Sequence, residues 1–383
     1  MISKLSPALF PATLLLASCS ATANVDTETS ASEPQLSIEE LGTYDEPWAA
    51  AFVPGTEVLV LTTKTGEMHG YDTVNQRAIF FEGVPEVDYG GQGGLGDIAF
   101  LPSEAADTLS DRTIYLSWAE AGSGNTRGAV LGRGTMVCED HQTCAIRDME
   151  VIWRQTPKTS KRGHYSHRIR FSPDEEYIFL ASGDRQELEP AQDNSNNLGT
   201  IVRLNLDGTP AAGNPFAEEG GVTSEIWSYG HRNILGMDWD AQGRLWDMEH
   251  GPGGGDELNL VEAGANYGWP TRSNGDHYNG DDIPDHTADD GFNKPAIWWT
   301  PVIAPGDMIF YSGDMFGAWQ GDALIAGLQS GGLVRVEIDG ENATEAARYD
   351  LGGRIRSVDE APDGALWVLE DGEGGRLLRI TAE

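Results

Sequence analysis

A short pattern of β-type residues recurs along the chain and constrains the fold more than any other feature. A turn with Pro, Asp or Gly is followed by an apolar run, a short gap and a second run. The pattern occurs about six times: VPGTEVLVLTT from Val53, LSDRTIYLSWA from Leu109, SPDEEYIFLASGD from Ser172, DAQGRLWDMEHG from Asp240, WQGDALIAGL from Trp319 and APDGALWVLEDG from Ala361. Partner runs follow from Gly199, Gly331 and Gly375.

A single hairpin cannot bury both of its faces, so hairpin-sized units that recur along a chain indicate radial repetition. The sequence therefore predicts an all-β fold, a six-bladed β-propeller with four-stranded antiparallel blades. A pair of β-sandwiches is the alternative, but it would not explain why PDG-x-LW returns in the same local context. Propellers bind ligands in loops at one end of the central channel, so we expect the long polar insertions to carry the function.

The first residues indicate an export signal. Lys4 is the only charged residue before Cys19, and the apolar run 8–17 is too short to cross a bilayer. The run ends in LASC, which resembles the cleavage box of bacterial lipoproteins; a plain secretory signal is the alternative. The sequence predicts a lipoprotein signal peptide at 1–18, a flexible tether at 19–36 and a propeller domain at 37–383, with Cys19 lipidated and the protein facing the periplasm from the outer membrane.

Two more cysteines lie in the segment CEDHQTC, from Cys138 to Cys144. An exported chain meets an oxidising compartment, which favours a small disulfide loop. Cys138, His141 and Cys144 could instead supply three zinc ligands. Neither interpretation implies catalysis.

The chain is very acidic, with a formal net charge of −36. Such a surface repels nucleic acid and anionic membranes, so no nucleic-acid partner is expected, and a solvated surface suited to saline surroundings is the simplest explanation. One segment differs. KTSKRGHYSHRIR, from Lys158 to Arg170, carries lysines, arginines and two histidines but no acid. This positive segment predicts a site for an anionic ligand.

Four insertions combine glycines with Arg, His, Gln or Asn. A packed blade needs none of these polar side chains, whereas a pocket for a planar anion needs most of them. The insertions are YGGQGGLGDIAF (89–100), RGHYSHRIRF (162–171), YGHRNILG (229–236) with the following MEHGPGGGDELN (248–259) and NYGWP (266–270), and GGRIRSV (352–358).

YGHRN, EHGP…GGDELNL and NYGWP, in this order, resemble the soluble quinoprotein glucose/sorbosone dehydrogenases, particularly their aldose sugar dehydrogenase branch. The resemblance runs from EPWAAAF, Glu46 to Phe52, to the C-terminus. It implies a six-bladed propeller that binds pyrroloquinoline quinone (PQQ) and calcium and oxidises the anomeric carbon of aldose sugars to lactones. A cytochrome or the quinone pool would accept the electrons.

The resemblance also implies roles for the matching residues. His164, which forms an H-x-x-x-R motif with Arg168, would be the catalytic base. Cofactor contacts would come from Gln92, Arg232, Asn233, Tyr278, Gln329, Arg354 and Arg356. Backbone carbonyls of Gly251 and Pro252 would hold calcium, and Glu257 with the backbone near Tyr267 would hold a further calcium. An acidic turn without metal is the alternative.

Two positions depart from the family pattern. Gln329 stands where a lysine usually lies near the quinone, so a positive charge is lost there. Gly163 precedes the base in place of an Asp or Asn, which predicts a histidine without its usual orienting neighbour. Two rival functions therefore stay open: a calcium-dependent lactonase, against which Arg354 and Arg356 argue, and a catalytically impaired propeller that binds PQQ or sugar.

Overall fold

The structure is a computed structural model that describes residues 34–109, 111–139 and 142–383. The predictions for the signal peptide, for Cys19, for most of the tether and for His141 fall outside the described residues. The chain divides into two units, and the second, Pro34–Glu383, contains all of the described structure. Within it, no helix has the length and apolar character that crossing a bilayer would require.

The fold is all-β, as the sequence predicts, and its only helices in the described chain are short 3-10 turns. The strands form four four-stranded sheets, one eight-stranded sheet and one two-stranded pair within the same residues. The 3-10 turns are η1 (Pro102–Glu104), η2 (Glu189–Gln192), η3 (Ala217–Glu219), η4 (Gly221–Glu225) and η5 (Gly317–Trp319).

The eight-stranded sheet consists of two antiparallel runs of four strands. Its spatial order is β2 (Pro47–Phe52), β3 (Val58–Thr63), β4 (Met68–Asp72), β5 (Arg77–Glu82), β9 (Thr143–Arg154), β8 (Arg127–Cys138), β7 (Arg112–Ala121) and β6 (Leu95–Phe100). The two runs meet where β5 pairs in parallel with β9. Cys138 and Cys144 lie opposite each other at the β8–β9 hairpin and are joined by a disulfide.

The other sheets are antiparallel throughout. One sheet contains β10 (Ser166–Phe171), β11 (Tyr177–Ser182), β12 (Thr200–Asn205) and β13 (Ile226–Tyr229), and the next contains β14 (Ile234–Trp239), β15 (Leu245–Glu249), β17 (Asp256–Leu260) and β19 (Ile297–Trp299). A third contains β20 (Pro305–Phe310), β21 (Ala323–Gly327), β22 (Gly332–Asp339) and β23 (Asn342–Asp350), and a fourth contains β24 (Ile355–Glu360), β25 (Leu366–Glu370), β26 (Gly375–Ala382) and β1 (Leu36–Tyr44). The two-stranded pair is β16 (Gly253–Gly254) with β18 (Gly275–Asp276). The first strand of the described chain, β1, thus completes the sheet that holds the last, β26.

The recurring sequence pattern corresponds to one strand of each run. Its apolar segments form β3, β7, β11, β15, β21 and β25, the second strand in each case. The aspartates of the pattern close the preceding turns. Asp240 Oδ1 accepts hydrogen bonds from the backbone N–H groups of Gln242 and Arg244, both at 2.9 Å, and Asp363 Oδ1 accepts one from Ala365 at 3.0 Å.

The core lies between adjacent sheets because each second strand is buried on both faces. Leu59 and Leu61 of β3, for example, pack in one cluster with Trp367 and Leu369 of β25. All four side chains are at most 3% exposed. Burying a side chain of this size contributes about 1.5–3 kcal/mol, so packing between sheets provides most of the fold's stability.

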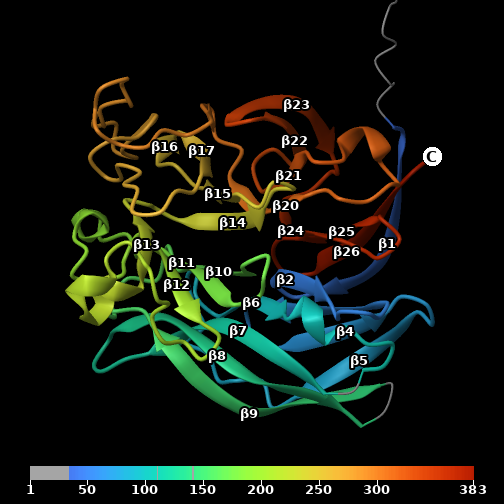
Figure 1. The fold of residues 1–383 in the computed structure, drawn as a ribbon. Coiled ribbons are helices and arrows are strands. Elements are labelled where there is room, and N and C mark those ends of the chain that lie inside the picture. The colour runs from blue at the N-terminus through green and yellow to red at the C-terminus, as the bar shows by residue number, and fades with distance from the viewer. Residues whose placement is uncertain (1–33, 110, 140–141) are drawn as a thin grey trace, which may run out of the picture. The chain divides into compact units, whose positions relative to one another are not determined.

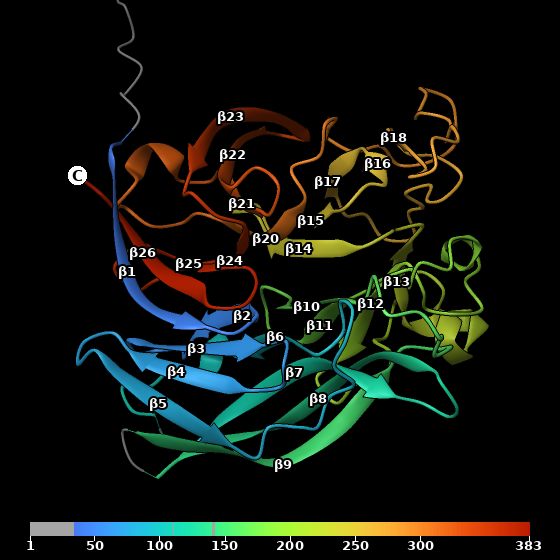
Figure 2. The same ribbon diagram turned by 180° about the vertical axis from the view of Figure 1, so that it is seen from behind.

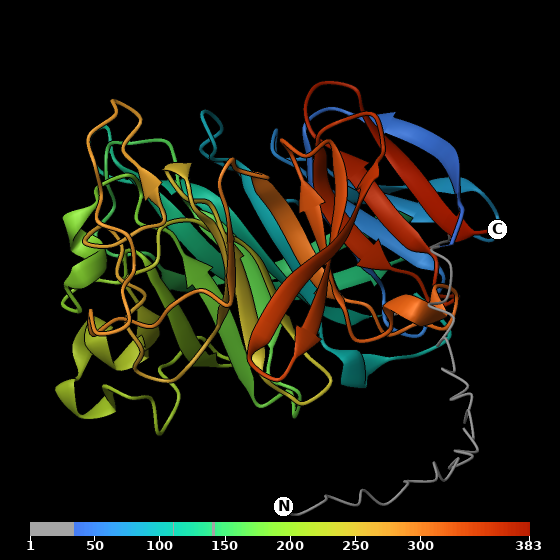
Figure 3. The ribbon, with the colours of Figure 1, turned by 90° about the horizontal axis from the view of Figure 1, so that it is seen from above.

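The first strands of the runs, β2, β6, β10, β14, β20 and β24, gather at the centre of Pro34–Glu383 (Figures 1 and 2). Each of these central strands contacts the next, and β24 contacts β2. The view at right angles places the connecting loops above and below them (Figure 3).

Arg168 of β10 ties the central strands together. Its Nε donates to Leu235 O at 2.6 Å and its Nη2 to Gly306 O at 2.7 Å, while Nη1 lies 3.0 Å from Asp97 Oδ1. The guanidinium also lies over the Trp48 ring, 4.3 Å from its centroid. The side chain is 1% exposed, and such a buried charge is tolerated only when it is paired and fully hydrogen-bonded.

Candidate active site

Two cavities lie at opposite ends of the central strands. We call them the strand-start cavity, about 240 Å³, and the strand-end cavity, about 680 Å³. The strand-start cavity is lined by His167 of β10 and Arg356 of β24. The strand-end cavity is lined by Arg170 and Asp359 of the same two strands. The insertions predicted to carry the function lead to the strand-start cavity.

Four predicted cofactor residues line the strand-start cavity: Gln92, Asn233, Arg354 and Arg356. The two arginines share one carboxylate, Asp371. Arg354 donates Nε and Nη2 to Asp371 Oδ2, both at 3.0 Å, and Arg356 donates the same atoms to Oδ1 at 2.9 and 2.7 Å. Both guanidinium groups are thereby oriented, and two positive charges outweigh one negative charge at this wall of the cavity.

His164 is held by a buried acid. Its Nδ1 lies 2.7 Å from Oδ1 of Asp184, which is fully buried, and its backbone N–H donates to Gln92 Oε1 at 2.6 Å. Asp184 Oδ2 accepts a hydrogen bond from Trp269 Nε1 at 2.7 Å. Burial lowers the pKa of His164, with Arg232 and Arg185 acting in the same direction and Asp184 opposing them. A neutral imidazole bound through Nδ1 leaves Nε2 as its proton acceptor.

Asp184 corrects one expectation. Because Gly163 precedes the base, the sequence predicts a histidine without an orienting neighbour, and this is wrong: Asp184 fills that place from twenty residues further along the chain. It follows β11, the second strand of its run, as His250 follows β15 and Asp371 follows β25. The shared position within the recurring pattern was a signal that could have identified all three residues.

Arg232, Asn233 and Tyr278 come together beside the cavity. Arg232 donates Nη1 to His250 O at 3.0 Å and Nη2 to the Tyr278 hydroxyl at 3.1 Å. Arg232 Nε and Asn233 Oδ1 are buried and have no hydrogen-bond partner among the described residues. Buried polar atoms are rarely left unpaired, so this donor and acceptor set fits a polar, anionic, planar ligand such as PQQ.

Gln329, in contrast, is not brought into the cavity. Its side chain is exposed, and the neighbouring Leu328 lines the wall instead. A different cation does reach the wall: Lys64, from the turn between β3 and β4, with Nζ 2.8 Å from Glu46 Oε1. Lys64 thus brings an ammonium group to this wall, but Glu46 already neutralises its charge.

The basic side chains of the positive segment are paired with acids elsewhere. Lys161 lies 3.2 Å from Glu187, Arg162 lies 2.9 Å from Asp88, and Arg168 is bound to Asp97. The segment is therefore not a free positive patch, and its charge alone does not indicate an anion site. Its relevance to the site rests on His164.

Three of the four predicted calcium residues, Gly251, Glu257 and Tyr267, line one small cavity, and Pro252 follows Gly251 in the same loop. Asp256 holds this loop, accepting hydrogen bonds from Gly251 N at 2.9 Å and Ala304 N at 2.6 Å. Asp256 thereby orders the loop whose backbone carbonyls are the predicted ligands, a ligand type that Ca²⁺ accepts readily.

Carboxylates crowd together beside that loop. Glu257 lies opposite Glu249 in the β15–β17 pair; burial, and then Glu249, raises the pKa of Glu257 well above its usual range. Ligand atoms of Glu249, His231 and Asp247 lie within 4.8 Å of one another, and Asp247 Oδ2 has no hydrogen-bond partner in the described chain. A divalent cation would relieve this repulsion, so the residues fit a metal.

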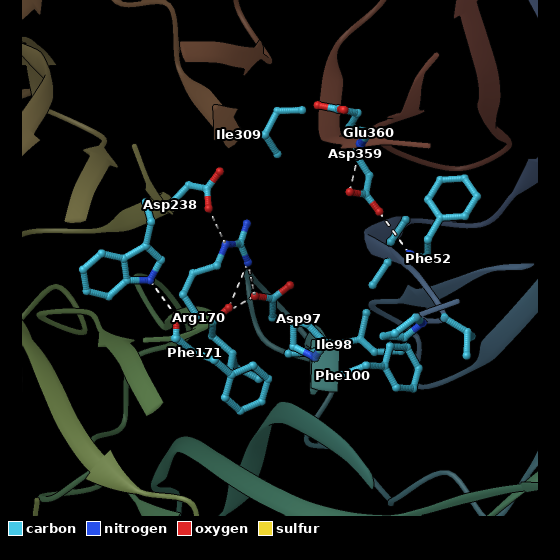
Figure 4. A pocket seen from close by; sticks show the side chains of 18 of the residues that line it. Phe52, Asp97, Ile98, Phe100, Arg170, Phe171, Asp238, Ile309, Asp359 and Glu360 are labelled. Carbon is cyan, nitrogen blue, oxygen red and sulfur yellow. Dashed lines mark hydrogen bonds and ion pairs between the residues drawn. The ribbon is translucent and has the colours of Figure 1, made fainter. Parts of the chain in front are cut away.

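The strand-end cavity is also rich in charge, but its acids join neighbouring central strands (Figure 4). Backbone N–H groups donate to each: Ile169 to Asp97 at 2.8 Å, Phe310 to Asp238 at 2.8 Å and Phe52 to Asp359 at 3.1 Å. Arg170 lies among them, 3.6 Å from Asp97 and 3.7 Å from Asp238. These side chains serve the fold.

Together, the sheets around a central channel and the arginine-rich cavity beside a histidine–aspartate pair define a propeller-like sugar dehydrogenase site. The sequence model of the family "Glucose / Sorbosone dehydrogenase" matches residues 44–379. The chain belongs to this family.

Named relatives agree with this assignment. Aldose sugar dehydrogenase YliI of Escherichia coli is 36% identical over 342 residues, covering 88% of this chain and 90% of the relative. The crystal structure of the soluble aldose sugar dehydrogenase from Escherichia coli in the apo form superposes with a TM-score of 0.84 at 35% identity, over 91% of this chain and 100% of that one. The PQQ-bound aldose sugar dehydrogenase of Streptomyces coelicolor gives a TM-score of 0.72 at 27% identity, over 91% and 100% of the two chains.

Proposed function

We propose that this protein is a PQQ- and calcium-dependent aldose sugar dehydrogenase that oxidises the anomeric carbon of its substrate to a lactone. The observation that carries the proposal is the His164–Asp184 pair beside a cavity lined by Arg354, Arg356 and the unpartnered Asn233. We further propose that the two halves of the eight-stranded sheet are separate blades, which makes the domain a six-bladed propeller.

In this proposal the chain's residues bind, orient and move one proton. Arg354 and Arg356, aligned by Asp371, hold carboxylates of the cofactor, and Gln92, Arg232, Asn233 and Tyr278 bind its other polar atoms. PQQ, when bound, supplies the oxidising centre that takes up the hydride from the sugar. His164 Nε2 accepts the proton of the C1 hydroxyl, and Asp184 stabilises the imidazolium that results.

Calcium would be held by the loop at Gly251 and Pro252, with a further ion at Glu257 and the backbone near Tyr267. The support is the crowding of the buried Glu249 and Glu257, which a divalent cation would neutralise. The loop is already fixed by Asp256, so little rearrangement is needed to present its carbonyl oxygens.

Reconstitution tests the proposal. Purified protein is titrated with PQQ in the presence of Ca²⁺, aldoses are added, and reduction of the quinone is followed by its absorbance. Reduction that disappears on exhaustive chelation and returns with Ca²⁺ supports the proposal. Hydrolysis of lactones without PQQ would instead favour a lactonase, and PQQ binding without reduction by any aldose would favour an impaired binder.

We also propose that the protein is exported and lipid-anchored at Cys19, facing the periplasm from the outer membrane. The support is the LASC segment, which lies outside the described residues. Cys19→Ser should release the protein from the membrane fraction without changing catalysis. A cytochrome or the quinone pool would be the electron acceptor.

A further inference from the structure

We propose that the indole of Trp269 is a positioning residue that places both the base and a cofactor anchor, so that proton acceptance at His164 and binding at Arg232 depend on one side chain. This inference rests on the proposed function, because it uses the roles given there to His164 and Arg232. Trp269 itself touches neither sugar nor reacting atoms in this scheme.

The first contact runs through Asp184. One oxygen of this acid, Oδ1, is used by His164 Nδ1 at 2.7 Å and by the backbone N–H of Gln186 at 2.8 Å. The other, Oδ2, accepts Trp269 Nε1 at 2.7 Å. Asp184 is 0% exposed, so without the indole its outer oxygen would lack a donor and water could not easily replace it. The indole therefore fixes the rotation of the carboxylate that holds His164.

The second contact is with Arg232. The guanidinium carbon lies 5.2 Å from the centroid of the Trp269 ring, within the range of a cation–π interaction. The two segments are also joined through the backbone, because Asp184 N donates to Arg232 O at 2.9 Å. A shift of the Trp269 indole would therefore change the positions of both His164 and Arg232.

Trp269 is itself well held. Its backbone N–H donates to Gly230 O at 2.9 Å, and Gln192 Nε2 donates to its carbonyl oxygen at 2.8 Å. The ring is 5% exposed and packs with Ala191 and Ile283. Because the Trp269 ring is held from several sides, it can fix the positions of Asp184 and Arg232.

Two variants, W269F and D184N, should shift the pKa of His164 in opposite directions. The charged groups that act on His164 are Asp184, Arg232 and Arg185, and His164 in turn helps to lower the pKa of His250. The indole N–H draws charge from Asp184, so W269F should strengthen the pull of the carboxylate on the imidazolium and raise the pKa of His164. D184N removes the negative charge and should lower it. A residue that only fills space would not produce this opposition.

The test is an NMR titration of the histidine side chains in the protein without cofactor, with the His164 signals assigned from H164Q. In W269F the protonation constant of His164 should rise by up to about tenfold, because only part of the free energy of the lost hydrogen bond to Asp184 is transmitted to the imidazolium. PQQ affinity should fall by at most about twofold, because phenylalanine keeps an aromatic ring but is a weaker cation–π partner for Arg232 than indole. The control is W153F, because Trp153 is also buried and donates Nε1 to a carboxylate, Glu225, at 2.8 Å. It should change neither quantity.

An unchanged His164 titration in folded W269F, or equal shifts in W269F and W153F, would overturn the proposal. If W269F does not fold, W269M serves instead, because methionine also lacks the N–H donor and fills an apolar site, and the protonation constant of His164 should rise as in W269F. Failure of the proposed function would be seen separately, as no quinone reduction by aldoses in the unsubstituted protein loaded with PQQ and Ca²⁺. That outcome leaves the titration result unaffected.

Discussion

The two ends of the central strands carry charged side chains that are used in opposite ways. At the strand-end cavity, Asp97, Asp238 and Asp359 accept hydrogen bonds from the backbone of the next central strand. At the strand-start cavity, Asn233 Oδ1 has no hydrogen-bond partner among the described residues, and neither has Nε of Arg232 beside it. Cavity volume alone would favour the strand-end cavity. Hydrogen bonding favours the other, because an unpaired buried polar atom indicates a missing ligand, whereas a paired one holds the fold.

The largest expected effect is at the strand-start end. His164→Ala should reduce quinone reduction by aldose about 10²–10⁴-fold, the usual contribution of a general base. PQQ affinity should stay nearly unchanged, because the arginines provide the binding, and rapid mixing with titration measures both. His167→Ala is the control: burial lowers the pKa of that imidazole to about 3, and it lacks the aspartate that orients His164, so its loss should reduce turnover far less. Near-normal turnover in His164→Ala would contradict the proposed base.

The second prediction concerns the strand-end cavity, where a substitution should reduce stability and leave cofactor binding almost unchanged. Asp97→Ala leaves Arg168 without one of its carboxylates and should lower the free energy of unfolding by about 3–5 kcal/mol. Urea denaturation measures this loss, and PQQ affinity of the remaining folded protein should be little changed. Arg348→Ala, which breaks the exposed pair with Glu345, should cost at most about 1 kcal/mol. Equal costs in the two variants would show that the central acids are not structural.

The third effect sharpens the contrast in binding. Arg232→Ala should weaken PQQ binding by about 1.5–3 kcal/mol, the value of a hydrogen bond to a charged group. Equilibrium titration with PQQ is the measurement. Arg170→Ala, at the strand-end cavity, should leave the affinity unchanged. Loss of affinity in Arg170→Ala, but not in Arg232→Ala, would show that the cofactor binds in the strand-end cavity instead.

The last expected effect is a pH dependence of stability at the strand-end cavity. Burial raises the pKa of Asp359 to about 7, above its value of about 3.9 in the unfolded chain. The folded state therefore holds this proton between about pH 4 and pH 7 while the unfolded state releases it, and stability should fall as pH rises through that window.

Asp359→Asn should flatten this part of the profile, because the amide oxygen can still accept the Phe52 hydrogen bond but cannot ionise. Asp289→Asn, at an exposed position, serves as the control and should leave the slope unchanged. Denaturation curves between pH 4 and 7 provide the measurement. A slope that persists in Asp359→Asn would assign the effect to another buried acid.

Local patterns in the sequence were sufficient for the strands but not for their long-range partners. The second strands, such as β11 and β25, could be predicted because an apolar run between turn residues is a local property. The parallel pairing of β5 with β9 could not, since nothing local specifies a partner so far along the chain. The ion pairs that neutralise the positive segment are missed for the same reason.

The site shows the same division. Glycine-rich insertions and the family resemblance pointed to His164, Arg232 and Arg356, whose segments are distinctive in sequence. Asp184 follows an ordinary strand, and its importance appears only when that strand end meets His164. Gln329 shows the reverse case: the resemblance suggested a cofactor contact, but the side chain is exposed and does not line the cavity. A match in sequence position does not determine which way a side chain points.

The pairing of β1 with β26 has a consequence for how the chain reaches its native state. Leu36 lies opposite Ala382, so this sheet is complete only when two strands from distant parts of the chain have paired. Closing so long a loop is slow, although its entropic cost grows only with the logarithm of length. Until then the edge of β26 that faces β1 has no partner. An unpaired strand edge can pair with another chain, so the step that joins β1 to β26 also protects the fold from aggregation.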